Sequence, residues 1–132
     1  MKLIEKNGVI LAKHITPGDW NEGLSFFSED GEFIQVGAWN YSAGKDLLRH
    51  IHNEVERKVT RTYECLYLVS GAIAVQIYDL QENPVDEFVA RAGDVVILLE
   101  CGHGYQILED GTRVLEVKNG PYPGADIDRR RF

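Results

Sequence analysis

The sequence predicts a single all-β domain. Thirteen glycines separate short apolar segments along the whole chain, which is the pattern of many strands divided by turns. Several of these segments alternate apolar and polar residues, and none sustains a period of 3.6 residues. The length of 132 residues suits one domain, and 44% hydrophobic residues supply one core without disulfides or a structural metal.

The predicted strands follow one another from the N-terminus to residue 118. They are a first segment around 3–12, two arms of a hairpin at 24–27 and 32–41, and then 64–69, 72–80, 85–90, 95–99, 105–108 and 112–118. Two runs with the sequence Glu-Asp-Gly, at 29–31 and 109–111, predict turns in which the glycine has a positive φ. The run 43–49 predicts either a loop or a short turn of helix.

Alternation also predicts which side chains face the core, because successive residues of a strand point to opposite faces. Glu64 shares a face with the leucines at 66 and 68, and His103 shares one with Tyr105 and Ile107. The segment 95–99 is apolar on both faces and is expected to be a central strand. Glu64 and His103 each sit at a strand end on an inward face, so we expect the two side chains to meet.

Charge and apolar run length exclude several classes of protein. Twenty-one acidic against fourteen basic residues give a net charge of -7, which repels a nucleic-acid backbone. The longest apolar runs, 65–69 and 95–99, are far shorter than the ~20 residues of a membrane-spanning helix, and no secretory signal is evident at the N-terminus. We therefore expect a cytoplasmic protein that binds neither nucleic acid nor membrane. Cys65 and Cys101 form no CxxC pair and are expected to be reduced.

Three of the four histidines are candidates for chemistry. His50 and His52 are two residues apart in a segment that is expected to be a strand, so both rings would lie on one face and could bind one metal ion. The alternative is a pair of partly exposed histidines before a polar loop. Flanking glycines allow the backbone to bend at His103. An inward Glu64 requires an ion pair, hydrogen bonds or a metal.

These residues together resemble the two motifs of the cupin family. Gly44 followed by His50-Ile51-His52, and Glu64 followed by Gly71, are similar to the first motif; Gly93-Asp94 and the glycine-flanked His103 are similar to the second. The resemblance implies a double-stranded β-helix, or jelly-roll barrel, over roughly residues 40–118. A hairpin at 20–41 would precede this barrel, and a tail at 119–132 would follow it.

The resemblance also implies a divalent metal ion, such as iron, manganese, nickel or zinc, in the mouth of the barrel. Its ligands would be His50, His52, Glu64 and His103. Eleven residues separate His52 from Glu64, however, which is more than the family motif has. Either residues 53–63 are an inserted loop and the four ligands still converge, or the site is metal-free and Arg57 and Arg61 bind an anion. A third interpretation is that 53–58 is simply a solvated, charged loop.

The expected function is binding of a small polar ligand, a sugar derivative or an organic acid, in the barrel mouth. Glu64 and His103 would exchange protons in an enzyme, either beside a metal or in a metal-free isomerase or epimerase of sugars. The competing interpretation is a non-catalytic binding or sensor module. Small cupins of unassigned activity are similar to this chain, and some are associated with carbohydrate biosynthesis.

We expect one pocket to contain most of these side chains. Its predicted lining is His52, Arg57, Glu64 and His103, with His50 and Tyr105 at its margin, Arg61 as a further ligand-binding residue, and His14 outside. The hairpin at 20–41 carries more aromatic residues than a small barrel interior can absorb, namely Phe26, Phe27, Phe33, Trp39 and Tyr41. Some of these rings are expected to cover an interface in a homodimer.

Overall fold

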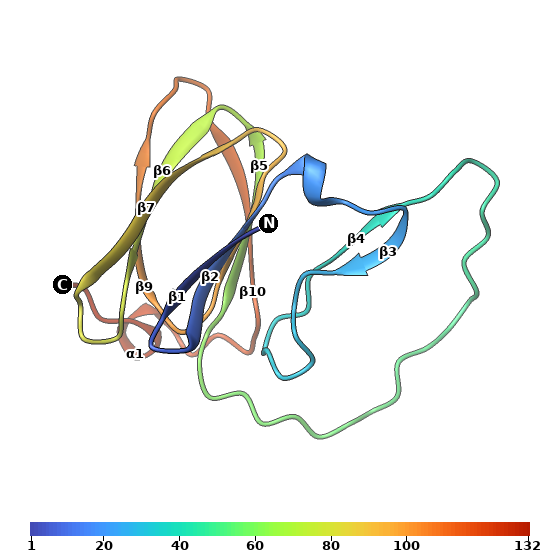
Figure 1. The fold of residues 1–132 in the computed structure, drawn as a ribbon. Coiled ribbons are helices and arrows are strands. Elements are labelled where there is room, and N and C mark those ends of the chain that lie inside the picture. Colours follow the sequence, from blue (N-terminus) through green and yellow to red (C-terminus); the bar gives the residue numbers. More distant parts are fainter.

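The computed structural model describes residues 1–132 and is built of antiparallel β-sheets (Figure 1). Its elements are β1 (Lys2–Lys6), β2 (Val9–Ile15), a 3-10 turn η1 (Pro17–Asp19), β3 (Gly23–Phe26), β4 (Gly37–Asn40), β5 (Glu64–Ser70), β6 (Ala72–Tyr78), β7 (Pro84–Arg91), β8 (Val95–Leu98), β9 (Gly102–Ile107), β10 (Arg113–Lys118) and α1 (Ala125–Asp128). The all-β prediction is confirmed. No helix is of the length and apolar character needed to cross a membrane.

Two sheets face each other and enclose the main core (Figure 1). The larger has the order β1-β2-β8-β5-β10, and the smaller has the order β7-β6-β9. Leu66 and Leu68 of β5 pack in one apolar cluster with Ile73 and Val75 of β6. The inward faces predicted for these strands are confirmed. We call this pair of facing sheets the sandwich.

A second core lies on the outer face of the larger sheet. Ile97 of β8 packs there with Phe27 and Ile34 from the segment that joins β3 to β4. β8 therefore contributes alternate residues to both cores, which confirms that it is apolar on both faces. Lys13 of β2 is buried under the same segment, where Nζ donates to the Phe27 carbonyl at 2.8 Å and pairs with Glu32 Oε1 at 2.7 Å.

The N-terminal hairpin exists, but its turn was predicted in the wrong place. β3 pairs antiparallel with β4, and the connection runs from residue 27 to residue 36. Gly31 does not have the predicted positive φ. The reason is packing: Phe27 and Ile34 leave the ladder to enter the second core. The other predicted glycine turn does have a positive φ, at Gly111, but it joins β9 to β10, which lie in different sheets.

The segment 41–63 contains neither strand nor helix, so the predicted strand at His50 and His52 is wrong and no helical turn forms at 43–49. In Figure 1 it leaves β4 as a long open loop and returns to β5. The only backbone hydrogen bond formed within it joins Lys45 to Ser42. Without a partner strand, the i, i+2 spacing of His50 and His52 does not produce a strand.

Candidate functional site

Four polar side chains gather between the sheets, where three strands begin or end. Glu64 starts β5 and lies opposite Lys118, the last residue of β10. His103 and Tyr105 of β9 lie beside Ile77 and Val75, two core residues of β6. Because paired residues share a face of the sheet, both β9 side chains point toward the larger sheet.

The carboxylate of Glu64 is the centre of this cluster. His103 Nε2 lies 3.2 Å from Glu64 Oε2, so the two side chains meet as the strand alternation predicts. Lys118 Nζ lies 2.8 Å from Oε1, and the Tyr105 hydroxyl donates to Oε2 at 3.4 Å. Glu64 is only 8% exposed. Each of its oxygens therefore has a charged or polar partner in place of water.

These contacts keep Glu64 ionised. Burial alone would raise the pKa of this carboxyl, but the hydrogen bonds from His103 and Lys118 outweigh it and lower the pKa to about 2. The hydrogen bond to Glu64 in turn raises the pKa of Lys118. Burial and the nearby charge of Glu64 raise the pKa of Tyr105, so its phenol stays neutral.

His103 has one free ring nitrogen. Its Nε2 is held by Glu64, whereas Nδ1 is buried and has no hydrogen-bond partner. The ring lies against Tyr105, with centroids 5.3 Å apart. Because a carboxylate accepts only, Nε2 carries a proton, which leaves Nδ1 of the neutral imidazole as an acceptor.

The neighbouring cysteine does not add a nucleophile. Burial raises the pKa of Cys101 to about 12, and the charge of Glu64 acts in the same direction. Cys65 is buried, and its pKa rises to about 11. Both thiols are therefore protonated near neutral pH, as residues with a structural role are.

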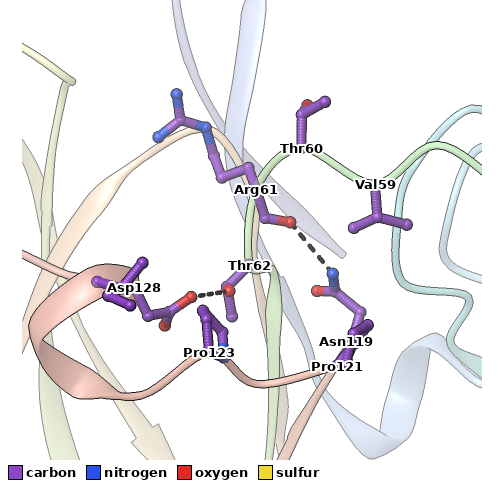
Figure 2. A pocket seen from close by; sticks show the side chains of 10 residues that line it. Val59, Thr60, Arg61, Thr62, Asn119, Pro121, Pro123 and Asp128 are labelled. Atoms are coloured by element: carbon purple, nitrogen blue, oxygen red, sulfur yellow. Dashed lines mark hydrogen bonds between the residues drawn. The ribbon is translucent and has the colours of Figure 1, made fainter.

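A pocket of about 400 Å³ lies just beyond the ends of β5 and β10 that carry Glu64 and Lys118 (Figure 2). Most of its lining is polar or proline, and consists of Val59, Thr60, Arg61, Thr62, Asn119, Gly120, Pro121, Pro123, Ile127 and Asp128. Figure 2 shows Asn119 donating to the Arg61 carbonyl, at 3.1 Å, and Thr62 paired with Asp128. The Arg61 guanidinium points away from Asn119, and its Nε lies 3.0 Å from Glu100 Oε2.

The C-terminal tail forms one wall of this end of the sandwich. Besides the contact of Asp128 with Thr62, Arg130 pairs with Glu82, and the ring of Phe132 packs edge-on against Tyr78 at 5.1 Å. Arg130 thus pairs with a carboxylate side chain of the same protein. Of the three tail arginines, Arg130 at least is engaged within the protein.

The structure brings together only some of the predicted site residues. Glu64, His103 and Tyr105 are in contact, whereas His50, His52 and Arg57 lie exposed in the segment 41–63. There the rings of His50 and His52 are 5.1 Å apart, and Arg57 Nη1 donates to the Val55 carbonyl at 3.4 Å. His14 lies outside the cluster, as predicted, with Nε2 2.8 Å from Asp94.

The cluster as placed does not fit the four-ligand metal centre that the cupin resemblance implies. Both Glu64 oxygens already face cationic or N–H groups, and the Lys118 ammonium would repel a divalent ion beside it. No group of three or more His, Cys, Asp or Glu side chains is arranged to hold a metal ion. Metal binding stays a prediction, and the acid–base chemistry proposed for the cluster does not require a metal ion.

Sequence reasoning missed Lys118. The buried Glu64 signalled that a partner was needed, but fourteen lysines and arginines were candidates. The register of β5 with β10 could have selected Lys118, because it pairs Glu64, the first residue of β5, with Lys118, the last residue of β10.

No family of proteins, curated protein or solved structure matches this chain. Function is therefore inferred from the residues of the cluster and from the motif positions.

Proposed function

We propose that the protein binds a small polar ligand, a sugar derivative or an organic acid, at the end of the sandwich that carries Glu64, His103 and Lys118. We further propose that the two facing sheets are a cupin-like double-stranded β-helix. In support, the motif glycines 44, 71 and 93 all have positive φ values, which side chains other than glycine rarely adopt. The antiparallel pairing of both sheets is in keeping with this fold.

The observation that carries the proposal is the buried, unpartnered Nδ1 of His103. A buried polar atom without a partner costs about 1–3 kcal/mol. A ligand hydroxyl or carboxyl group could supply that partner. The polar pocket just beyond Glu64 and Lys118 offers room for the rest of such a ligand at the same end of the sandwich.

The cluster is also suited to acid–base chemistry. Ionised Glu64 orients the ring of His103 and stabilises the imidazolium, so Nδ1 can accept a proton from a carbon beside a ligand carbonyl and return it. The neutral phenol of Tyr105 can donate a hydrogen bond to the oxygen that gains charge. These roles fit a metal-free isomerase or epimerase of sugars. The same contacts without proton transfer fit a binding module.

The test is ligand binding by matched histidine variants. A panel of aldose phosphates, nucleotide sugars and hydroxy acids would be screened by NMR of the ¹⁵N-labelled histidine rings. His103→Gln should weaken binding of any responding compound by about 10–100-fold, the value of a hydrogen bond to a charged or buried group. His50→Gln, in the exposed segment, should leave binding unchanged.

The same variants distinguish the metal-dependent alternative. If His50→Gln, His52→Gln and His103→Gln weaken ligand binding equally, and elemental analysis shows that each also loses stoichiometric metal, the site is metal-dependent and the metal-free proposal is wrong. Deuterium exchange from solvent into a bound sugar would identify an isomerase or epimerase. Binding without exchange would identify the non-catalytic module.

A further inference from the structure

The ribbon of β3 and β4 presents its large apolar residues to solvent. Leu24 pairs with Trp39 across the ladder, so these two side chains share a face with Phe26. Phe26 and Trp39 are 59% and 63% exposed, while Ala38 on the other face is buried against the second core. Together with Tyr41, which follows β4, these residues form what we call the platform: Leu24, Phe26, Trp39 and Tyr41.

The ring of Phe26 occupies the space that a side chain at position 37 would take on this face. A Cβ on Gly37 would lie 3.2 Å from the ring of Phe26, so the ring lies directly over the Gly37 backbone. Monomeric proteins rarely leave so many adjoining large apolar side chains in water. This face therefore has the character of an interaction surface.

The segment that follows has the same character. We call residues 42–62 the arm; its exposed apolar residues are Leu47, Leu48, Ile51, Val55 and Val59. Leu48 and Ile51 are 90% and 92% exposed, so no part of the same chain covers them. Connections of this length without secondary structure are uncommon in compact domains, and many of those known are binding segments.

Charge makes the two surfaces complementary. The stretch 19–40, which contains the ribbon, has five acidic residues and no basic one. Two of the five are paired within the chain, Asp19 with the N-terminal ammonium and Glu32 with Lys13, which leaves Glu22, Glu29 and Asp30. The arm has five basic and three acidic residues, a net charge of +2 in a chain of net charge -7. An arm from another molecule is thus attracted to the ribbon by charge as well as by apolar contact.

We propose that the platform binds the arm of a second copy of this chain, and that two copies exchange arms reciprocally. Each copy has one platform and one arm, so a two-fold dimer pairs both sets of surfaces and leaves none open. The exposed apolar area of the two surfaces is roughly 1,000 Å² per chain, against roughly 800 Å² per partner in a stable interface. Two copies therefore have enough area to form a lasting dimer.

The first test is the mass of the protein in solution, by sedimentation equilibrium. The wild type is expected to be a dimer at micromolar concentration. Trp39→Ser and the double variant Leu48→Ser/Ile51→Ser should each raise the dissociation constant by about 100-fold, since central aromatic and aliphatic anchors dominate such interfaces. Ile127→Ser, which changes an exposed apolar residue of the tail, is the control and should remain dimeric. Unchanged circular dichroism would show that the variants fold.

The second test identifies the contact. Trp39→Cys and Ile51→Cys would be prepared as separate proteins in a Cys101→Ser background. Each would be oxidised by itself, and a mixture of the two would be oxidised in parallel. Crosslinked dimers that form only in the mixture support arm exchange. Dimers formed by either variant alone would show like-to-like contacts and overturn it. An intrachain crosslink in a protein that carries both Trp39→Cys and Ile51→Cys would show that the arm folds back on its own chain, and a monomeric wild type would show that the arm stays free; either result would also overturn it.

Discussion

The sandwich and the segment 20–63 both contain large apolar side chains, but they differ in how far these side chains are exposed to solvent. Leu68 in β5 is fully buried, whereas Ile51 in the arm is 92% exposed. The difference lies in pairing: β5 has a neighbouring strand on each side, and the arm has none. In the sandwich, apolar residues reach the core because paired strands place one face of each sheet against the other sheet. The sandwich is therefore stabilised within one chain, whereas the arm leaves its large apolar residues exposed.

The largest expected effect tests this contrast directly. Leu68→Ala should lower the free energy of unfolding by about 4 kcal/mol, because it leaves a cavity in the main core. Ile51→Ala should change it by less than about 0.5 kcal/mol in the monomer. Urea denaturation of both variants, at a concentration where the protein is monomeric, is the measurement. A similar decrease in the free energy of unfolding in both variants would mean that the arm is packed against the rest of the chain.

Lys13 tests the boundary between the two regions. Lys13→Ala should destabilise the protein by about 3 kcal/mol, because Glu32 then remains buried without its partner. Lys13→Met combined with Glu32→Leu should restore most of the loss, since it removes both charges. Urea denaturation would measure each step, and an equal loss in the double variant would show that the ion pair is not what matters there.

Lys118→Met should cost about 1–2 kcal/mol at pH 7, because Glu64 loses one of its two cationic or N–H partners. The folded-state pKa of Glu64 lies below its ordinary value of 4.5, so its stabilising contribution is complete above pH 4.5 and is lost as the pH falls toward 2. The stability curves of wild type and variant should therefore converge in acid. Glu116→Gln, at the other contact of Lys118, is the control and should have little effect.

The smallest effect concerns the tail. Phe132→Ala should lower stability by about 0.5 kcal/mol, because the ring is more than half exposed and packs edge-on against Tyr78 and beside Gly102. Amide hydrogen exchange of residues 125–132 should become faster in this variant. Unchanged exchange would show that the contacts of Arg130 and Asp128 alone hold the tail.

Most strand positions in the sandwich could be predicted from sequence, because turns and alternation are local. The exception is the single segment predicted around 3–12, which is a hairpin of β1 and β2. The faces of Glu64 and His103 followed from that alternation and are confirmed by their contact. The ten-residue connection after β3 could not be predicted, since what removes Phe27 from the ladder is a core formed with β8, far along the chain.

The histidine pair shows the same limit. His50 and His52 have the spacing of a strand face, but spacing creates a strand only when a partner lies beside it. Lys118 was missed for a related reason, because its place opposite Glu64 depends on the register of two strands distant in sequence. The local sequence pattern therefore predicted which face of a strand a side chain occupies, while the pairing of strands distant in sequence decided which side chains meet.

The contact between Glu64 and His103 is most directly tested by a carboxyl ¹³C NMR titration of Glu64. The wild type should titrate with a midpoint near pH 2, and His103→Gln should move the midpoint upward toward 4.5, because one of the two hydrogen bonds that favour the carboxylate is gone. A wild-type midpoint near 4.5, or one that His103→Gln does not move, would show that these side chains do not meet and would remove the basis of the proposed site.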